Sequence, residues 1–233
     1  MYDDRIDFVS AYCDRWCERC PFTQRCSAFV AMAAVAMCED DKEGLELAFG
    51  RAPDDDGVVT SPPDWLNDLE DVSLSDREAD AWAERCQQRR ARINAMPIVQ
   101  LADALMRLAY EWLRANPQVG DTQDALVREA FEVANYDVIL IRAKLHRALD
   151  GREIRGTDDA LMNDDPVQND WNGSAKVALI SIERSATAWA VLASATGQEA
   201  PAVVAGQLHD LGAHVEREFP DVRRFKRPGF DAG

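Results

Sequence analysis

The stretch TQDALVREAFEVANYDVILIRAKLHRALD, residues 122–150, decides the fold of this chain. Its apolar residues recur at alternating spacings of four and three, which is the heptad pattern of a long helix with one buried face. A helix is therefore expected from Thr122 to Leu149, where Gly151 ends it. The residues of this apolar face are Val127, Phe131, Ala134, Val138, Ile141, Leu145 and Ala148.

Further helices are predicted on both sides of this stretch. Ser75, with Glu78 three residues later, forms a capping box at a helix start, and Pro97 suits the first turn of the next helix. Ser174 is expected to open another helix, in which a second apolar face has heptad spacing, and a last helix is expected over about 200–219. No alternating strand pattern occurs, so the predicted fold class is all-α, with a helical bundle.

Four cysteines gather near the N-terminus, in the run YCDRWCERCPFTQRC. Their spacing, C-x3-C-x2-C-x5-C, is short enough for four thiolates to converge on one metal centre. The candidate metal ligands are Cys13, Cys17, Cys20 and Cys26. The other two cysteines, Cys38 and Cys86, are interpreted as small buried apolar residues.

The cysteine run is expected to form a helical hairpin. Apolar periodicity predicts a helix from Asp3 to Trp16, and its continuation would place the first three cysteines on one face. Pro21 then stops that helix, and Thr23 is a plausible N-cap for a second helix through SAFVAMAAVAM, with Cys26 in its first turns. Two antiparallel helices would hold the metal between them.

Sulfur spacing bears on which metal is bound. Zinc needs four sulfurs at about 2.3 Å in a tight tetrahedron, and its usual sites place two C-x2-4-C pairs far apart in sequence. This run has a single C-x2-C pair. A cubane iron–sulfur cluster is larger, and closely bunched cysteines followed by proline are a common arrangement for it. The sequence leaves three alternatives open: a [4Fe-4S] cluster, a structural zinc ion, or no metal.

The segment CERCPFTQRC, Cys17 to Cys26, resembles the C-x2-C-P-F-x3-C hook that carries a [4Fe-4S] cluster in RecB-like nucleases. Its C-x2-C-x5-C spacing is also similar to the iron–sulfur loop of the helix-hairpin-helix DNA glycosylases. The resemblance implies cluster ligation by Cys17, Cys20 and Cys26, with Cys13 inferred as the fourth ligand. It covers ten residues of 233 and does not extend to nuclease or glycosylase activity, because the nucleases' strand-borne Asp…Glu-x-Lys motif is missing.

The chain has 233 residues and a formal net charge of −16, and the acids are concentrated between Glu39 and Asp80. Such a stretch repels phosphate, so no nucleic-acid binding is expected, and the two basic clusters are expected to pair with its acids or a partner's. The clusters are Arg85, Arg89, Arg90 and Arg92, and Arg223, Arg224, Lys226 and Arg227. The predicted organisation is a cysteine-rich hairpin over 1–50, an acidic linker over 51–74, a helical bundle over 75–219 and a basic tail over 220–233.

Residues of the predicted bundle raise two further kinds of site, a di-iron site and a pocket for an anionic ligand. A carboxylate-bridged di-iron site would need Glu-x-x-His pairs, and none occurs among the glutamates and the three histidines, His146, His209 and His214. Polar residues of the predicted third and fourth helices indicate either a network of interhelical salt bridges or a pocket for a small anionic ligand near the NGSAK segment. The candidate residues of that pocket are Asp170, Ser174 and Lys176.

The sequence favours a metal-binding helical protein, with a redox or radical-enzyme accessory role and a protein partner. The alternative is an adaptor protein with a structural zinc clip, and a third reading is a ferritin-like di-iron oxidase. Whether the chain is an enzyme stays open. A cytoplasmic location without membrane association is expected, because the N-terminus is acidic and the longest apolar run, Ala28 to Met37, falls short of the roughly 18 residues of a membrane span.

Overall fold

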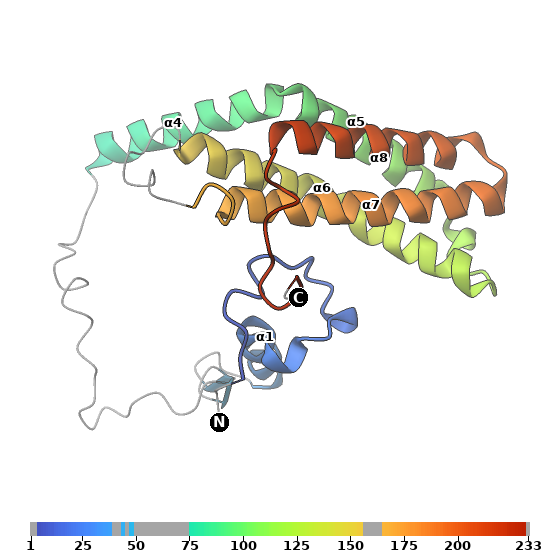
Figure 1. The fold of residues 1–233 in the computed structure, drawn as a ribbon, viewed down its shortest axis with the longest axis horizontal. Coiled ribbons are helices and arrows are strands. Elements are labelled where there is room, and N and C mark those ends of the chain that lie inside the picture. The colour runs from blue at the N-terminus through green and yellow to red at the C-terminus, as the bar shows by residue number, and fades with distance from the viewer. Residues whose placement is uncertain (1–3, 39–42, 45–46, 49–74, 156–164, 232–233) are drawn as a thin grey trace. The chain divides into compact units, whose positions relative to one another are not determined.

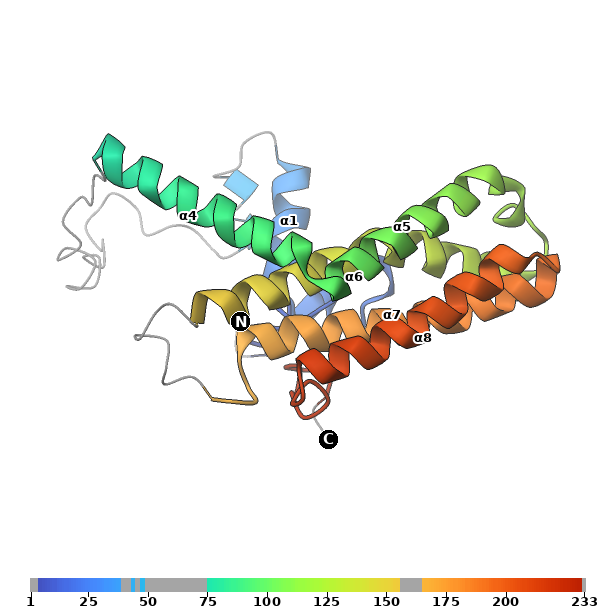
Figure 2. The same cartoon turned by 90° about the horizontal axis from the view of Figure 1, so that it is seen from above.

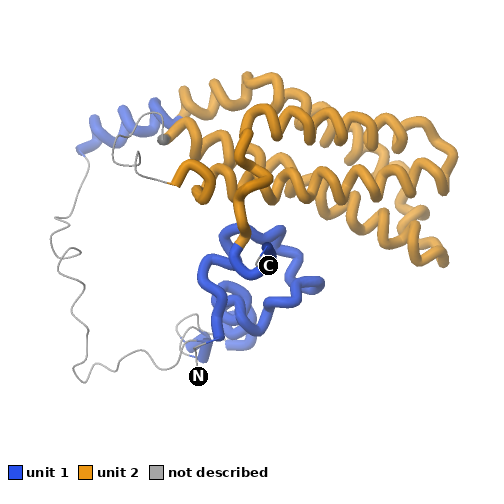
Figure 3. The backbone as a smooth tube through the Cα atoms, viewed as in Figure 1, with its two compact units in different colours: residues 1–86, 228–233 blue, residues 87–227 orange. Residues whose placement is uncertain are grey.

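The computed structural model describes residues 4–38, 43–44, 47–48, 75–155 and 165–231, so the predicted linker over 51–74 lies outside the described residues. The chain forms two compact units: residues 1–86 with 228–233, and residues 87–227 (Figure 3). Throughout the described ranges the regular secondary structure is helical, and no strand occurs there. The predicted all-α class is confirmed.

The larger unit is a four-helix bundle (Figures 1 and 2). Each helix packs against the next one in the chain, and the last returns to the first, which closes the bundle. A polar helix, α4 (Asp76–Ala95), leads into it and buries only Ile93. The bundle helices are α5 (Pro97–Ala115), α6 (Ala125–Arg155), α7 (Asp170–Thr196) and α8 (Glu199–Glu218).

The two predicted apolar faces form much of the bundle core. Every residue of the face on α6 is buried except Phe131, which is half-buried. An aromatic cluster closes one end of the core, where the Trp112 ring lies 5.3 Å from the Trp189 ring and 6.5 Å from that of Phe131. The indole N–H of Trp112 donates to Gln198 Oε1 at 2.6 Å, so its one polar atom is paired.

The α7 helix is buried on more than one side, because it packs against both α6 and α8. Within the described residues it alone is long and apolar enough to cross a membrane by length and composition. Of the most apolar 18-residue stretch of α7, 56% is buried inside the protein. The core helix of a helical bundle has the same length and apolar composition.

The capping box at the start of α4 is confirmed, because Ser75 N–H donates to Glu78 Oε2 at 2.9 Å and Glu78 N–H to Ser75 Oγ at 3.4 Å. The predicted end of α6 at Gly151 is wrong, since the helix continues to Arg155. Glycine costs a helix interior only about 1 kcal/mol. Packing outweighs that cost here, because Gly151 lies against Trp171 at the start of α7.

Two predicted helix starts also differ from the structure. Helix α6 begins at Ala125 rather than at Thr122, because the Asp124 carboxylate accepts the Leu126 N–H at 2.9 Å. Helix α7 begins at Asp170 rather than at Ser174, because the Asn169 side chain caps it by accepting the Asn172 N–H at 2.9 Å.

Within the described residues, members of both basic clusters pair with acids of the larger unit, and the expected pairing with acids of the linker lies outside the described residues. Arg89 contacts Asp150 at 2.8 Å and Arg92 contacts Glu153 at 3.5 Å. In the tail, Arg223 bridges Glu183 and Glu216, and Arg224 pairs with Asp221. At least four of the eight bases in these clusters are therefore paired with acids within the molecule.

The expected basic tail does not start at residue 220 as a separate segment. Phe219, Val222 and Phe225 are each about 2% exposed or less, and a pair of hydrogen bonds joins the Gln168 side chain to the Lys226 backbone. The bundle unit accordingly ends at residue 227 rather than at 219.

A buried ion pair that the sequence analysis did not single out links α6 to α7. The Asp137 side chain is fully buried, and the Arg184 guanidinium donates to both of its carboxylate oxygens, at 3.0 and 2.5 Å. Bidentate geometry makes this a strong charge-assisted contact. Removing one partner of a buried pair is costly because the other charge is left uncompensated.

We expect Arg184→Ala to lower the free energy of unfolding by about 3 kcal/mol, because it removes the counter-ion of the fully buried Asp137 carboxylate. The control is Arg147→Ala, which removes an exposed pair with Asp170 between the same two helices and should cost no more than about 1 kcal/mol. Urea titration followed by circular dichroism measures both variants. Equal losses in the two variants would contradict the importance assigned to the buried pair.

A fragment comprising residues 75–227 should fold as a helical unit, whereas one ending at 219 should be clearly less stable. The shorter fragment loses the buried Phe225, and deleting a buried phenylalanine side chain typically costs about 3–5 kcal/mol. Thermal melts of the two fragments test this boundary. If both melt at the same temperature, residues 220–227 contribute nothing to the bundle.

Candidate metal centre

The predicted helix from Asp3 to Trp16 is wrong, because its described residues, 4–16, form turns and irregular structure with no helix. Phe8 and Arg15 adopt the left-handed conformation, with φ of 60° and 61°, which an α-helix does not tolerate. The Asp14 carboxylate accepts the Trp16 N–H at 3.1 Å, a local hydrogen bond that competes with helix formation. The apolar residues of this segment therefore do not share a helical face.

Short 3-10 turns carry the rest of the cysteine run. They are η1 (Cys17–Arg19) and η2 (Thr23–Arg25), and Pro21 lies between them. Helix α1 (Ser27–Met37) follows, with Cys26 at its N-cap position in place of the predicted Thr23. The expected hairpin of two antiparallel helices is thus a turn-built loop followed by one helix.

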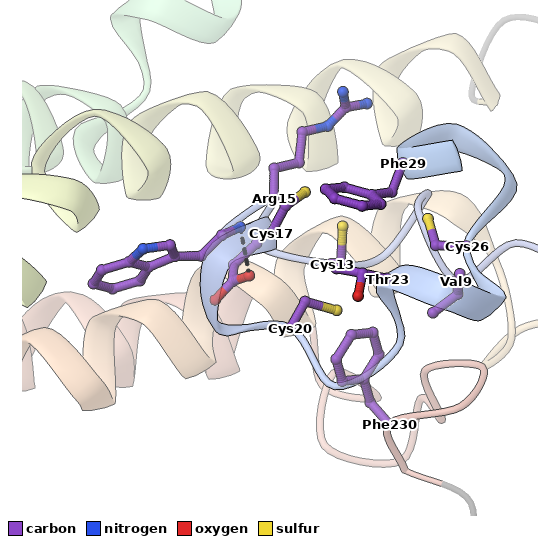
Figure 4. A pocket seen from close by; sticks show the side chains of 11 residues that line it. Val9, Cys13, Arg15, Cys17, Cys20, Thr23, Cys26, Phe29 and Phe230 are labelled. Carbon is purple, nitrogen blue, oxygen red and sulfur yellow. Dashed lines mark hydrogen bonds between the residues drawn. The ribbon is translucent and has the colours of Figure 1, made fainter. Parts of the chain in front are cut away.

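All four cysteines nevertheless line one recess, which is partly open to solvent and has a cavity volume of about 20 Å³. Figure 4 shows Cys13, Cys17 and Cys20 near Phe29 and Phe230, with Cys26 at the side of the same recess. Arg15, which lies between the first two cysteines, has a positive φ, and Cys20 and Cys26 directly follow the turns η1 and η2. The cysteines are therefore brought to one recess by turns and not, as predicted, by a shared helix face.

The thiols influence one another electrostatically. Burial raises the pKa of the Cys17 thiol, and negative charge on Cys13, Cys20 and Cys26 raises it further, with a contribution from Glu18. The four sulfurs thus repel one another when they are deprotonated. A cation held between them would remove this repulsion, and metal binding to cysteine releases the thiol protons.

The spacing of the sulfurs does not match a single ion. Among the described residues, no three side chains of His, Cys, Asp or Glu lie close enough together to hold one metal ion. A zinc ion would require the sulfurs to move inward to about 2.3 Å from a common centre. A cubane cluster is a larger group that holds its ligands further apart.

Aromatic and apolar side chains surround the sulfurs. Val9 is 3% exposed, and the Phe230 ring meets the Phe22 ring edge to face at 4.9 Å. The Arg19 guanidinium stacks on the Trp16 ring at 3.9 Å, which places a cationic side chain beside the cysteine loop. Sequence analysis missed Phe230, because nothing in the sequence indicates that residue 230 returns to the N-terminal unit.

The remaining cysteines, Cys38 and Cys86, lie outside the recess and are half-buried rather than buried. None of the six cysteines forms a disulfide bond. Their position makes Cys38 and Cys86 suitable internal controls for any experiment on the four recess cysteines.

The residues proposed for an anionic-ligand pocket do not form one. Asp170 pairs with Arg147 at 2.8 Å, and Lys176 donates to the backbone oxygen of Arg223 at 2.9 Å. Ser174 is completely buried, and its hydroxyl oxygen has no hydrogen-bond partner. Because α7 begins four residues earlier than predicted, the amides near Ser174 are inside the helix and are not available to an anion.

The alternative interpretation of these polar residues, a network of interhelical salt bridges, agrees with the structure, but the partners differ from those expected. Glu183 pairs with Arg223 rather than with Lys176, and Arg184 pairs with Asp137. These contacts connect α7 to α6 and to the segment after α8.

The residues considered for a di-iron site are also dispersed. His209 is exposed on α8, and His214 Nδ1 lies 2.8 Å from the backbone oxygen of Asp210. His146 is half-buried on α6, and its Nε2 atom is buried without a hydrogen-bond partner. No group of ligands in the described residues supports the ferritin-like reading.

His146 makes the stability of the protein depend on pH. Burial lowers its pKa, and the positive charges of Arg142 and Arg90 lower it further, whereas Asp150 and Asp103 raise it. The folded protein therefore favours the neutral imidazole. The corresponding stability is present above the ordinary histidine pKa of about 6.5 and is lost as the pH falls through the lowered pKa.

We expect His146→Leu to lose less stability than the parent protein when the pH falls from about 7 to about 5, because the variant has no buried imidazole to protonate. The control is His209→Gln, which alters an exposed histidine and should keep the parent slope. Urea titrations at several pH values measure the difference. Identical slopes for all three proteins would exclude His146 as the titrating group.

Comparison with known proteins gives no match to this chain. No family model matches it, and no characterised protein and no solved structure is significantly similar to it. The proposals below accordingly start from the residues and their geometry.

Proposed function

We propose that this chain binds a [4Fe-4S] cluster through Cys13, Cys17, Cys20 and Cys26 and acts as a redox or radical-enzyme accessory protein. The observation that carries the proposal is the convergence of all four cysteines on one recess. They come from 14 consecutive residues whose turns, rather than a shared helix, direct the sulfurs to it.

The donor set supports iron–sulfur chemistry. Four thiolates are soft ligands, which suit iron–sulfur clusters, zinc and copper(I) better than magnesium or calcium. When bound, such a cluster supplies one-electron transfer at a potential set by its hydrogen bonds and solvent exposure. The protein's own contribution is to hold the four sulfurs in place and to surround them with Val9, Phe29 and Phe230.

An accessory role includes a protein partner, because an electron carrier must dock with its donor and its acceptor. Nucleic acid is not proposed as that partner. The net charge of −16 opposes phosphate binding, and Arg223 and Arg224 of the C-terminal cluster are paired with acids. The resemblance of Cys17–Cys26 to nuclease hooks is used for ligation only.

The alternative is an adaptor protein in which the four cysteines hold a structural zinc ion. It uses the same ligands but requires the sulfurs to approach a tetrahedron around one ion. The two proposals differ in colour, metal content and sulfide content, so one preparation distinguishes them.

Anaerobically purified protein should show a broad visible absorption band and contain iron and acid-labile sulfide in equal amounts. Each of Cys13→Ser, Cys17→Ser, Cys20→Ser and Cys26→Ser should lose most of that iron, because a site with three of its four ligands binds metal far more weakly. Metal analysis of each variant measures the loss.

The matched controls are Cys38→Ser and Cys86→Ser, which alter half-buried cysteines outside the recess and should keep the full metal content. A colourless protein with bound zinc would contradict the cluster and support the structural zinc ion instead. Full iron content in Cys13→Ser would remove that residue from the ligand set, and a metal-free protein after anaerobic reconstitution would end the proposal.

A further inference from the structure

A segment near the C-terminal end of the described chain contributes to the cysteine recess. Residues 228–231 belong to the N-terminal unit, although more than 200 residues separate them from the four recess cysteines. Phe230 lines the recess together with the four cysteines, and Figure 4 shows its ring beside Cys20. The lining of the recess is therefore incomplete without Phe230.

Specific contacts hold this C-terminal segment. Gly229 is in the left-handed conformation, with φ of 79°, and a Cβ atom there would lie 2.9 Å from Cδ1 of Ile6. Only glycine satisfies both conditions without strain. Ile6 in turn donates its N–H to the backbone oxygen of Arg25 at 3.1 Å, next to Cys26. The ring of Phe230 then rests edge to face on Phe22, two residues after Cys20.

The residues immediately before this segment are anchored independently. Phe219, Val222 and Phe225 are buried within the bundle unit, and Arg227 is the last residue of that unit. Pro228 follows, and a proline limits the freedom of its own backbone and of the preceding residue. The C-terminal segment is thus short, restricted and attached at both ends.

We propose that Pro228–Asp231 is a strap that closes the cysteine recess, with Phe230 as its seal. The strap controls how readily solvent species, such as oxidants, chelators and thiol reagents, reach the four sulfurs. Its bearing on a bound cluster rests on the proposed function, but the control of thiol access does not. Release of the strap would expose the centre without unfolding the bundle.

The test measures the accessibility of the thiols in the reduced, metal-free, full-length protein. Phe230→Ala should raise the rate at which a thiol reagent modifies the four recess cysteines by about tenfold, because the seal no longer limits local opening. Peptide mass spectrometry after timed labelling gives the rate at each cysteine. Cys38 and Cys86 should react at unchanged rates, which reports that the rest of the protein is intact.

Two variants separate a seal from a general loss of structure. Phe8→Ala makes the same chemical change at a phenylalanine of the same unit that is 74% exposed, and it should leave the labelling rates unchanged. Phe230→Leu keeps apolar bulk and should restore most of the protection. Gly229→Ala should resemble Phe230→Ala, since it displaces the strap through its backbone.

Equal labelling rates in Phe230→Ala, Phe8→Ala and the parent protein would overturn the strap. Faster labelling of all six cysteines in Phe230→Ala, with no recovery in Phe230→Leu, would also overturn it, because the unit would then have unfolded. In protein that carries iron, release to a chelator should accelerate in the same order of variants. Faster thiol labelling in a protein that never binds metal would leave the strap standing and remove only the proposed cluster.

Discussion

Burial of α7 against both α6 and α8 is the constraint on which the bundle depends. A helix that is apolar on more than one side is stable only when neighbours cover those sides, and the heptad face of α6 supplies one of them. The short connection at Gly197 and Gln198 sends α8 back along α7, and α5 then closes the ring. Polar residues at the α6–α7 contact must be paired to be buried, and Asp137 with Arg184 meets that requirement.

The cysteine unit is organised on a different principle. Its first residues lack an apolar face that a neighbouring helix covers, and they fold as turns fixed by local hydrogen bonds and by two left-handed residues. Such a loop has little core of its own, and small units of this kind often depend on a metal for stability. The C-terminal segment adds apolar contacts through Phe230, so both termini contribute to one site.

The candidate sites within the bundle illustrate why polar residues near an apolar face are weak evidence for binding. Asp170 and Glu183 each pair with an arginine from a neighbouring segment, and Lys176 donates to a backbone oxygen, so these groups already have partners within the protein. A start of α7 four residues earlier than predicted removed the helix end on which the proposed pocket depended. A small error in a helix boundary is sufficient to move a site from the end of a helix into its interior.

The sequence by itself determined the fold class, the capping box at Ser75, the buried face of α6 and the gathering of four cysteines, because each of these depends on spacing along the chain. Tertiary structure alone decided that Asp137 would be buried with Arg184, that α6 would continue through Gly151, and that Phe230 would line the cysteine recess. These features arise from contacts between residues tens to hundreds of positions apart. Periodicity and local propensity report only what a residue's near neighbours favour, and packing between distant segments overrides that preference whenever it buries more surface or pairs a charge.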